Sequence, residues 1–410
     1  MAVKKEYKQT EVGVMPEDWL IHGFNALASI PSGQVDPKQE PFRSMVLVAP
    51  DHIESGSGRL LKKETAAEQK AISGKYLFAP GDVLYSKIRP YLRKATIAEF
   101  SGLCSADMYP LRPSGRTCAG FLLGVILGYR FSKYAESVSV RSGMPKINRD
   151  ELSTFYTALP PTLAEQEAIA GALSDADAWI ESLEQLIAKK RQIKQGAMQE
   201  LLTGKRRLPG FSGKWETKRL GEFLVSHPQY GINAASVSYS DRLPAYIRIT
   251  DITEYGQYAP NPRVSVYARD VTDYFLADGD LVFARTGASV GKSYRYRLSD
   301  GPLVFAGFLI RIRPIDQFLN PRFLEGYVTS EKYWNWVRLM SMRSGQPGIN
   351  GKEYAQLPIE LPSIEEQTAI ATVLSDMDTE IESLEAKLAK AREVKQGMMQ
   401  ELLTGRIRLV

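Results

Sequence analysis

PTLAEQEAIAGALSDADAWIESLEQLIAKKRQIKQGAMQELLTGKRRL, the stretch at residues 161–208, is written a second time as PSIEEQTAIATVLSDMDTEIESLEAKLAKAREVKQGMMQELLTGRIRL at residues 362–409. The copies align without a gap, and about 30 of roughly 48 positions are identical, far more than chance allows for an internal repeat. The repeat separates two less regular regions, each of which is followed by one copy. We therefore predict four parts, at residues 1–160, 161–208, 209–361 and 362–410.

Both copies have the pattern of a long helix. Thr162 and Ser363 each stand three residues before a glutamate, which is the capping box that marks a helix start. Gly204 and Gly405 stand where a left-handed glycine ends a helix. About 40 residues at a rise of about 1.5 Å predict a rod of roughly 60 Å.

Apolar residues recur in both copies at alternating steps of four and three, as in a coiled coil, although Lys190 and Lys194 interrupt the first seam. Two matched seams in one chain favour helices that pack on each other. The alternative is that each helix lies on its own domain. For the acidic pairs, such as Asp175 and Asp177, we expect a solvated helix face.

The two remaining regions predict α+β domains. Short β-rich runs such as DVLYSKI at residues 82–88 and DLVFAR at residues 280–285 alternate with Gly/Pro turns and occasional helices. The fold class is thus α+β, with two β-rich α/β domains separated by two long helices.

Composition restricts the class of protein. The chain has 24% charged residues, and no apolar run approaches the roughly 20 residues that span a membrane. The charged start MAVKKEYKQTEVG is unlike a secretory signal, and two cysteines suit a reduced compartment, so we expect a cytoplasmic protein. Three scattered histidines argue against a histidine-based metal site, and a net charge of +5 permits a nucleic-acid partner.

Two patterns resemble catalytic motifs and fail on inspection. ARTGASVGKS at residues 284–293 ends like a phosphate-binding loop, but only three residues separate Gly287 from Gly291 where four are required. A second pattern resembles the metal-binding motif of nucleases and consists of Asp51, Glu68 and Lys70. The sequence around Glu68 and Lys70 does not have the pattern of a strand, which that chemistry requires to hold both side chains rigidly. We therefore predict no catalytic and no metal-binding residues. The alternatives are an autonomous magnesium-dependent nuclease or NTPase, and a coiled-coil scaffold without DNA contact.

Basic residues with interleaved tyrosines follow the related runs GDVL and GDLV, and such residues suit contacts with DNA phosphates and base edges. A second pair of patches adds asparagine and glutamine, which can pair with adenine. The first region contributes Lys87, Arg89, Tyr91, Arg93, Lys94, Arg141, Lys146 and Asn148, and the second contributes Arg285, Thr286, Lys292, Tyr294, Arg295, Arg343, Gln346 and Asn350. Each single residue could instead belong to a solvated surface, and Asn148 and Asn350 could be turn or cap residues.

This combination resembles the specificity (S) subunit of type I restriction–modification systems, the HsdS family. The residues that carry the resemblance are PPTLAEQEAIAGALSDAD and PSIEEQTAIATVLSDMD at the helix starts, and KQGAMQELLTG and KQGMMQELLTG at their ends. GDLVFARTGASVGK and SGQPGIN also look like that family's recognition elements, and the resemblance covers essentially the whole chain. The first region departs from it, since SKIRPYLRK replaces ARTGASVGK.

The resemblance implies that each irregular region is a target recognition domain reading one half of a split double-stranded DNA sequence. The helices would form an antiparallel coiled coil that holds these domains apart, sets the spacer, and docks two methyltransferase (M) subunits. Adenosylmethionine would then be bound by those partners, ATP and magnesium would be used by restriction (R) subunits, and this chain would bind no cofactor and catalyse nothing.

Overall fold

The computed structural model describes residues 6–139, 143–342 and 345–409. The chain divides into two compact units, which are described separately. Unit 1 contains residues 1–185 and 385–410, and unit 2 contains residues 186–384. Each long helix therefore contributes one part of its length to each unit. Within the described residues, no helix is long and apolar enough to cross a membrane.

Unit 1 is built on a four-stranded antiparallel sheet of order β4-β10-β7-β8. A three-stranded sheet of order β5-β9-β6 and two strand pairs, β1/β2 and β3/β11, complete its β-structure. The strands are β1 (Tyr7–Thr10), β2 (Gly13–Pro16), β3 (Leu20–Gly23), β4 (Ala28–Ser29), β5 (Leu47–Val48), β6 (Tyr76–Phe78), β7 (Val83–Ser86), β8 (Ala95–Ile97), β9 (Gly102–Cys104), β10 (Met108–Pro113) and β11 (Tyr156–Leu159). The short helices are α1 (Phe24–Leu27), α2 (Ala119–Leu127), α3 (Tyr129–Val138) and α4 (Arg149–Ser153).

Unit 2 repeats this plan with a sheet of order β13-β20-β17-β18. Its second sheet has the order β14-β16-β15-β19, and β12 pairs with β21. The strands are β12 (Glu216–Arg219), β13 (Gln229–Tyr230), β14 (Ser236–Ser238), β15 (Ala245–Ile247), β16 (Val264–Val266), β17 (Leu281–Ala284), β18 (Ser293–Arg295), β19 (Leu303–Phe305), β20 (Leu309–Ile312) and β21 (Pro358–Leu361). The short helices are α6 (Pro321–Tyr327), α7 (Glu331–Ser341) and α8 (Gly351–Ala355).

A buried aspartate fixes the start of the central strand in each unit. Asp82, before β7, is paired through both carboxylate oxygens with Arg112, at 3.1 Å each. Asp280, before β17, is paired in the same way with Arg313, at 2.7 and 2.8 Å. These hydrogen bonds raise the pKa of both guanidinium groups. The Gly-Asp element of the sequence is therefore part of the scaffold.

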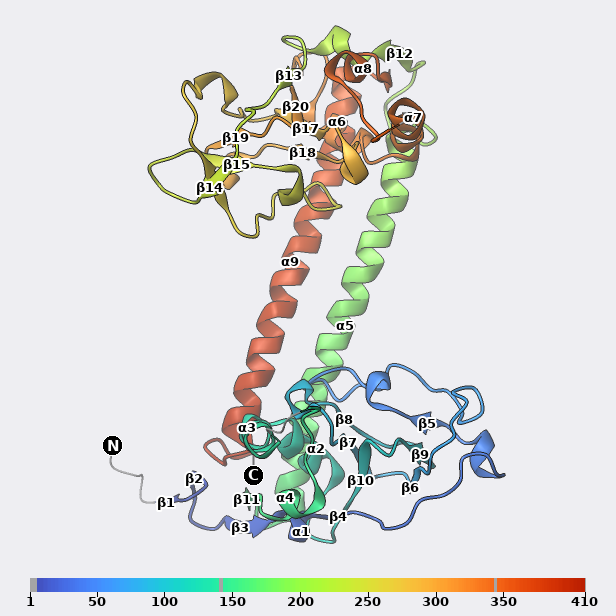
Figure 1. Ribbon diagram of the computed structural model, residues 1–410, viewed down its shortest axis with the longest axis vertical. Helices are drawn as coiled ribbons and strands as arrows, with labels where there is room; N and C mark the ends of the chain where they lie inside the picture. The colour runs from blue at the N-terminus through green and yellow to red at the C-terminus, as the bar shows by residue number, and fades with distance from the viewer. Residues whose placement is uncertain (1–5, 140–142, 343–344, 410) are drawn as a thin grey trace. The chain divides into compact units, whose positions relative to one another are not determined.

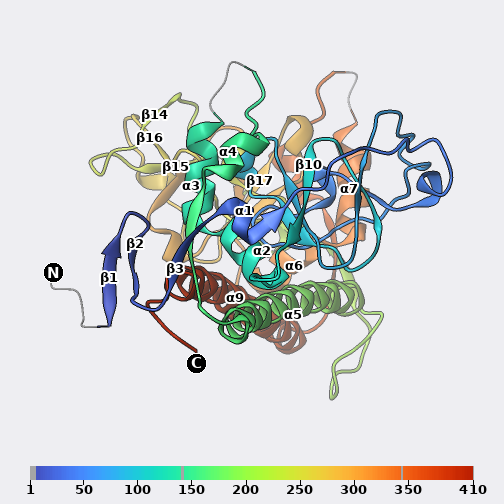
Figure 2. The same cartoon turned by 90° about the horizontal axis from the view of Figure 1, so that it is seen from below.

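The two repeats form the helices α5 (Leu163–Leu201) and α9 (Ile364–Leu402), which pack antiparallel (Figure 1 and Figure 2). The predicted caps are present: Thr162 accepts a hydrogen bond from the amide of Glu165, and Ser363 accepts one from that of Glu366. The terminal glycine Gly204 has a φ of +68°, as a left-handed helix end requires.

Both interpretations of the apolar seam hold for different parts of the helices. The ends join the domain cores, since Ile169 and Leu173 belong to the core cluster of unit 1 and Ile370 to that of unit 2. Residues nearer the middle, such as Ile187 and Ile381, are buried as well. The helices therefore pack both on the domains and on each other.

The lysines that interrupt the first seam are paired with acidic residues of the other helix. In unit 2, Lys190 pairs with Glu380 and Lys194 pairs with Asp378. In unit 1, Lys395, which is equivalent to Lys194, pairs with Asp177. The side chain of Asp177 is 39% exposed, as expected for a solvated face, but it also serves as an ion partner, which we did not expect. The physical reason is that a seam lysine of the other helix, only 9% exposed in the case of Lys395, needs a charge partner.

The residues that follow each long helix pack against a tryptophan at the start of a domain. In unit 2, Arg207 pairs bidentately with the buried Glu366, at 2.5 and 2.6 Å, and lies over the ring of Trp215. In unit 1, Arg408 pairs with the buried Glu165, and a Cβ on Gly405 would lie 3.1 Å from Trp19. The capping-box glutamates thus bind arginines instead of completing the reciprocal cap.

Candidate nucleic-acid interface

The basic turns predicted to face DNA have the same position and the same backbone frame in both units. In unit 1 the turn connects β7 to β8, and the amide of Ser86 donates to the carbonyl of Lys94 at 2.9 Å. In unit 2 it connects β17 to β18, and the amide of Ala284 donates to the carbonyl of Lys292 at 2.8 Å. A strand follows Lys292 where a phosphate-binding loop would open a helix, so the segment is the connection of a β-hairpin.

The second pair of predicted patches lies directly against these turns. In unit 1 the amide of Arg89 donates to Pro145 at 2.8 Å, and the amide of Ile147 donates to Lys87 at 2.9 Å. The corresponding bonds in unit 2 run from Gly287 to Pro347, at 3.0 Å, and from Ile349 to Arg285, at 2.9 Å. Each unit therefore presents one combined surface made of a turn and a loop.

This pairing shows which positions of the two patches are equivalent. Lys146 forms a bridge with Ile88, and its counterpart in unit 2 is Gly348, which forms a bridge with Thr286. Lys146 and Gln346 are therefore not equivalent positions. Arg141 and Arg343 lie outside the described residues.

The turn of unit 1 retains the backbone conformation of unit 2 without its glycines. Gly287 and Gly291 have φ values of +74° and +88°. Arg89 and Arg93 occupy the same positions with φ values of +47° and +48°. A side chain in this left-handed region costs about 1–2 kcal/mol, so the absence of glycine changes the energy of the turn and leaves its shape unchanged.

Three of the predicted residues of unit 1 are open to solvent: Arg89, Lys146 and Tyr91, the last of which is 53% exposed. The amine of Lys87 lies over the ring of Tyr109, 5.0 Å from its centroid. In the described chain, the side chains of Arg89 and Lys146 have no hydrogen-bond or ion-pair partner. These four residues form the accessible part of the predicted set.

The other described residues of the unit 1 set make contacts within the fold. The amine of Lys94 donates to the carbonyl of Pro50 at 2.7 Å, and the guanidinium of Arg93 lies against Gly56. Asn148 caps α4 by accepting from the amide of Glu151 at 2.8 Å, in a complete capping box. The alternative that this asparagine is a cap residue is thus correct.

In unit 2, the guanidinium of Arg285 lies over the ring of Tyr230, 5.1 Å from its centroid. Gln346 is exposed, and Thr286 is half-buried at the bridge to the loop. The amine of Lys292 forms an ion pair with the exposed Glu254 at 2.9 Å. Lys292 is therefore partly neutralised, whereas Arg285 and Gln346 remain open.

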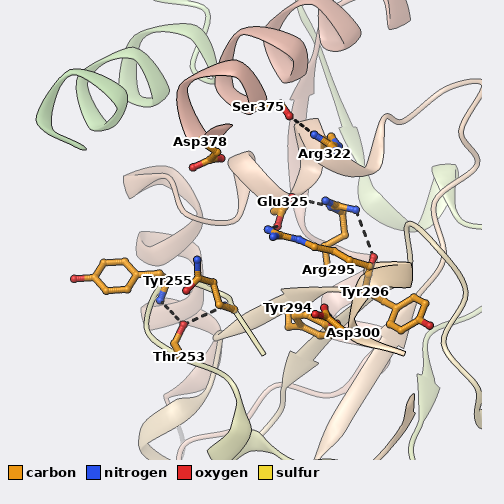
Figure 3. Close-up of polar contacts among 12 residues, drawn as sticks. Thr253, Tyr255, Tyr294, Arg295, Tyr296, Asp300, Arg322, Glu325, Ser375 and Asp378 are labelled. Carbon is orange, nitrogen blue, oxygen red and sulfur yellow. Dashed lines mark hydrogen bonds and ion pairs between the residues drawn. The ribbon is translucent and has the colours of Figure 1, made fainter. Parts of the chain in front are cut away.

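Three predicted DNA contacts of unit 2 do not fit the structure, and Figure 3 shows two of them, Tyr294 and Arg295. Tyr294 is only 2% exposed, and its hydroxyl donates to Asp300 at 2.6 Å, while burial raises the pKa of this phenol. Arg295 is 7% exposed and points to Glu325, which it binds at 2.7 Å. Asn350 caps α8 by accepting from the amide of Glu353. We withdraw these three residues from the interface, because packing and capping occupy them.

The tyrosines beneath the cations were missed by the sequence reasoning. Tyr109 lies in β10 and Tyr230 in β13, both of which pair with the central strands or their neighbours. Arg149 also stacks on Tyr109, while it donates to the carbonyls of Ile30 and Pro31. No local signal identifies these rings, because strand pairing brings them to the turns.

The residues of the rejected nuclease pattern do not form a site. Asp51 lies in a short 3-10 helix, and Glu68 accepts hydrogen bonds from Thr65 within a turn. Lys70 adopts a left-handed turn conformation. Within the described residues, no group of three His, Cys, Asp or Glu side chains could hold a metal ion.

Comparison with known proteins gives the family. Residues 55–195 and 213–393 match the family described as "Type I restriction modification DNA specificity domain". The chain belongs to the type I restriction–modification specificity subunit family, HsdS. It is therefore the DNA specificity subunit of a type I restriction–modification complex, and it recognises rather than catalyses.

Relatives of this HsdS chain include named specificity subunits. The EcoDI subunit of Escherichia coli is 35% identical over a match that covers 45% of this chain and 40% of that protein. The putative MjaX subunit of Methanocaldococcus jannaschii is 24% identical, with 99% of this chain and 97% of that protein covered. The EcoKI subunit of Escherichia coli is 22% identical, with 96% and 90% covered.

Solved structures have the same fold as this HsdS chain. A chain from a structure on complex assembly and conformational transition of the type I R-M system has a TM-score of 0.64 at 20% identity, with 96% of this chain and 99% of that chain covered. The S subunit from M. genitalium has a TM-score of 0.58 at 13% identity, with 98% of each chain covered. The predicted fold class, two β-rich domains with an antiparallel helix pair, is confirmed.

Proposed function

We propose that residues 1–160 and 209–361 each read one half of a two-part double-stranded DNA sequence. The observation that supports this most is that the same turn-and-loop surface is built twice with different side chains. The repeats that form α5 and α9, in contrast, share about 30 of roughly 48 positions. Different surfaces suit different half-sites, whereas similar helices suit two copies of the same partner.

The proposed DNA-facing surface contains the accessible residues of each unit. Lys87, Arg89, Tyr91 and Lys146 serve in unit 1, and Arg285, Thr286 and Gln346 serve in unit 2, with a smaller part for Arg93, Lys94 and Lys292. Cationic side chains neutralise phosphates, and arginine or glutamine can also read base edges. Arg141 and Arg343 stay in the proposal from sequence alone.

The partners in this proposal are two methyltransferase subunits, docked on α5 and α9, and restriction subunits. Adenosylmethionine would be bound by the former, and ATP and magnesium would be used by the latter, so the chemistry would take place in a cytoplasmic complex rather than in this chain. The distance between the recognition domains, set by residues 161–208 and 362–410, would define the spacer between half-sites, as dimer geometry does in other DNA-binding proteins.

The test is binding by the chain together with its methyltransferase partner. We expect a duplex with both half-sites to bind at least 1,000-fold more tightly than random duplex, a ratio typical of specific recognition at roughly 10³ or more. A duplex with either half-site scrambled should lose most of that preference. Equal affinity for all duplexes would favour a scaffold without DNA specificity, and DNA cleavage or ATP hydrolysis by the chain alone would favour an autonomous enzyme.

A further inference from the structure

The first residue of the turn in each unit is a cation mounted on a tyrosine. Lys87 follows β7 and lies over Tyr109, and Arg285 follows β17 and lies over Tyr230. The two rings come from different places in their sheets, since Tyr109 lies in β10 and Tyr230 in β13. The arrangement therefore recurs although it is assembled from different parts.

The backbone of Arg285 is held on both sides. Its amide donates to Phe308 at 3.1 Å, and its carbonyl accepts from Ile349 at 2.9 Å. The supporting ring is held as well, because the hydroxyl of Tyr230 accepts from the amide of Gly351 at 3.0 Å. Both the cation and its platform are thus preorganised before any ligand arrives, as a specific contact requires.

The guanidinium of Arg285 is buried at its Nε atom and accessible at its terminal nitrogens. Its Nε atom is buried and has no hydrogen-bond partner, whereas the residue as a whole is half-buried. The terminal nitrogens have no partner within the described residues. What remains accessible is the two-pronged end of the fork, which is the geometry that matches two adjacent acceptors.

Arg89, two positions after the mounted cation of unit 1, has the opposite character. It is exposed, and no ring in the described chain lies beneath it. An exposed cation without a supporting ring suits a phosphate, because cations can approach phosphate oxygens from many directions. The turn therefore combines a fixed cation with a free one.

We propose that Arg285 reads a guanine in the half-site recognised by unit 2, with Lys87 as its counterpart in unit 1. Guanine presents N7 and O6 side by side in the major groove, and a bidentate arginine is the side chain that pairs with both. The inference rests on the proposed function, and it adds the residue that reads and the base that is read.

The experiment selects duplexes from a random pool with the full chain and its methyltransferase partner, for the wild type and for Arg285→Ala. We expect the wild type to enrich a two-part motif with a guanine in the unit 2 half-site. Arg285→Ala should enrich the same motif with that one position open to any base. Its affinity for the wild-type motif should fall about 5- to 150-fold, which corresponds to roughly 1–3 kcal/mol for one bidentate pair.

Arg89→Ala is the matched control. Its affinity should fall by a similar factor on all duplexes, and the slope of log affinity against log salt should decrease by about 1, as for one lost phosphate contact. The same behaviour in Arg285→Ala, or an unchanged motif, would overturn the inference and leave the proposed function intact. A wild-type complex that enriches no motif would overturn the proposed function itself. Thermal unfolding should show that both variants are folded: Arg89→Ala should match the wild type, since its side chain has no hydrogen-bond partner to lose in the described chain, and Arg285→Ala should melt slightly lower, since it loses the contact with the Tyr230 ring.

Discussion

The same charge pair occurs at two depths of burial in the helices, which allows the effect of burial to be measured within one protein. Lys395 with Asp177 and Lys194 with Asp378 are equivalent pairs of the repeat. The lysine side chain is 11% exposed in the first pair and 23% in the second. The aspartates are 39% and 49% exposed. Chemistry and spacing are thus matched, and solvent access differs.

Removal of the aspartate should cost more in the more buried pair. Breaking a fully buried ion pair costs about 3–5 kcal/mol, whereas an exposed pair contributes about 0–1 kcal/mol. For Asp177→Asn, which leaves a nearly buried ammonium of Lys395 without its partner, we expect a loss of about 2 kcal/mol. For Asp378→Asn we expect about 1 kcal/mol, because water reaches Lys194 more easily.

The assay is urea unfolding followed by far-ultraviolet circular dichroism, with double-mutant cycles that include Lys395→Met and Lys194→Met. We expect a coupling energy in the first cycle about twice that in the second. The double variant Lys395→Met with Asp177→Leu should be at least as stable as the wild type, since an apolar pair avoids the desolvation of both charges. Equal coupling energies in the two cycles would refute the argument from burial, and energies near zero in both would show that the pairs do not hold the seam.

The remaining predictions concern the helix ends, the left-handed turn and the rod. Arg207→Ala leaves the buried carboxylate of Glu366 unpaired and should destabilise the chain by about 2–4 kcal/mol, measured by urea unfolding. Lys218→Ala, in an exposed pair, should change stability by less than about 1 kcal/mol. Equal losses would contradict the stabilising role of the Arg207–Glu366 pair. Arg89→Gly removes a side chain from a left-handed position, which stabilises the folded state by about 1–2 kcal/mol, but it also increases the entropy of the unfolded chain, which costs about 0.4–1 kcal/mol. Thermal unfolding should therefore show a gain in stability of up to about 1.6 kcal/mol, while DNA affinity falls. A loss of stability would mean that the side chain supports the fold. One extra heptad in each long helix adds about 10 Å, so we expect the recognised spacer to grow by about three base pairs of roughly 3.4 Å each. The spacer is read from selected duplexes, and an unchanged spacer would count against the proposal that the long helices set its length.

The helices could be predicted closely from the sequence because their signals are local. The cap residues Thr162 and Ser363 precede the observed starts, and Gly204 and Gly405 have the left-handed conformation of a helix end. The role of the capping glutamate Glu165 could not be predicted, since its partner Arg408 is distant in the sequence. Local patterns determine where a helix begins, whereas tertiary packing determines what its side chains bind.

The candidate interface could be predicted only in part. The position of the turns follows from the Gly-Asp runs, but the union of turn and loop depends on contacts between residues about 60 apart, such as Ile147 and Lys87. The cap at Asn148 has a local signal, because Asn-x-x-Glu is a capping box, and the cap was one of the alternatives that the sequence left open. The burial of Arg295 had none, since Glu325 comes from α6.

The central claim is that this chain gives a type I complex its specificity for a two-part DNA sequence, with one part read by each recognition domain. The most direct measurement maps N6-methyladenine across the host genome with the wild-type chain, without the chain, and with residues 209–361 exchanged for those of a relative. We predict one two-part motif whose methylation is lost without the chain and whose second half alone changes in the exchange. Methylation that persists without the chain, or a motif whose two halves change together, would contradict the account.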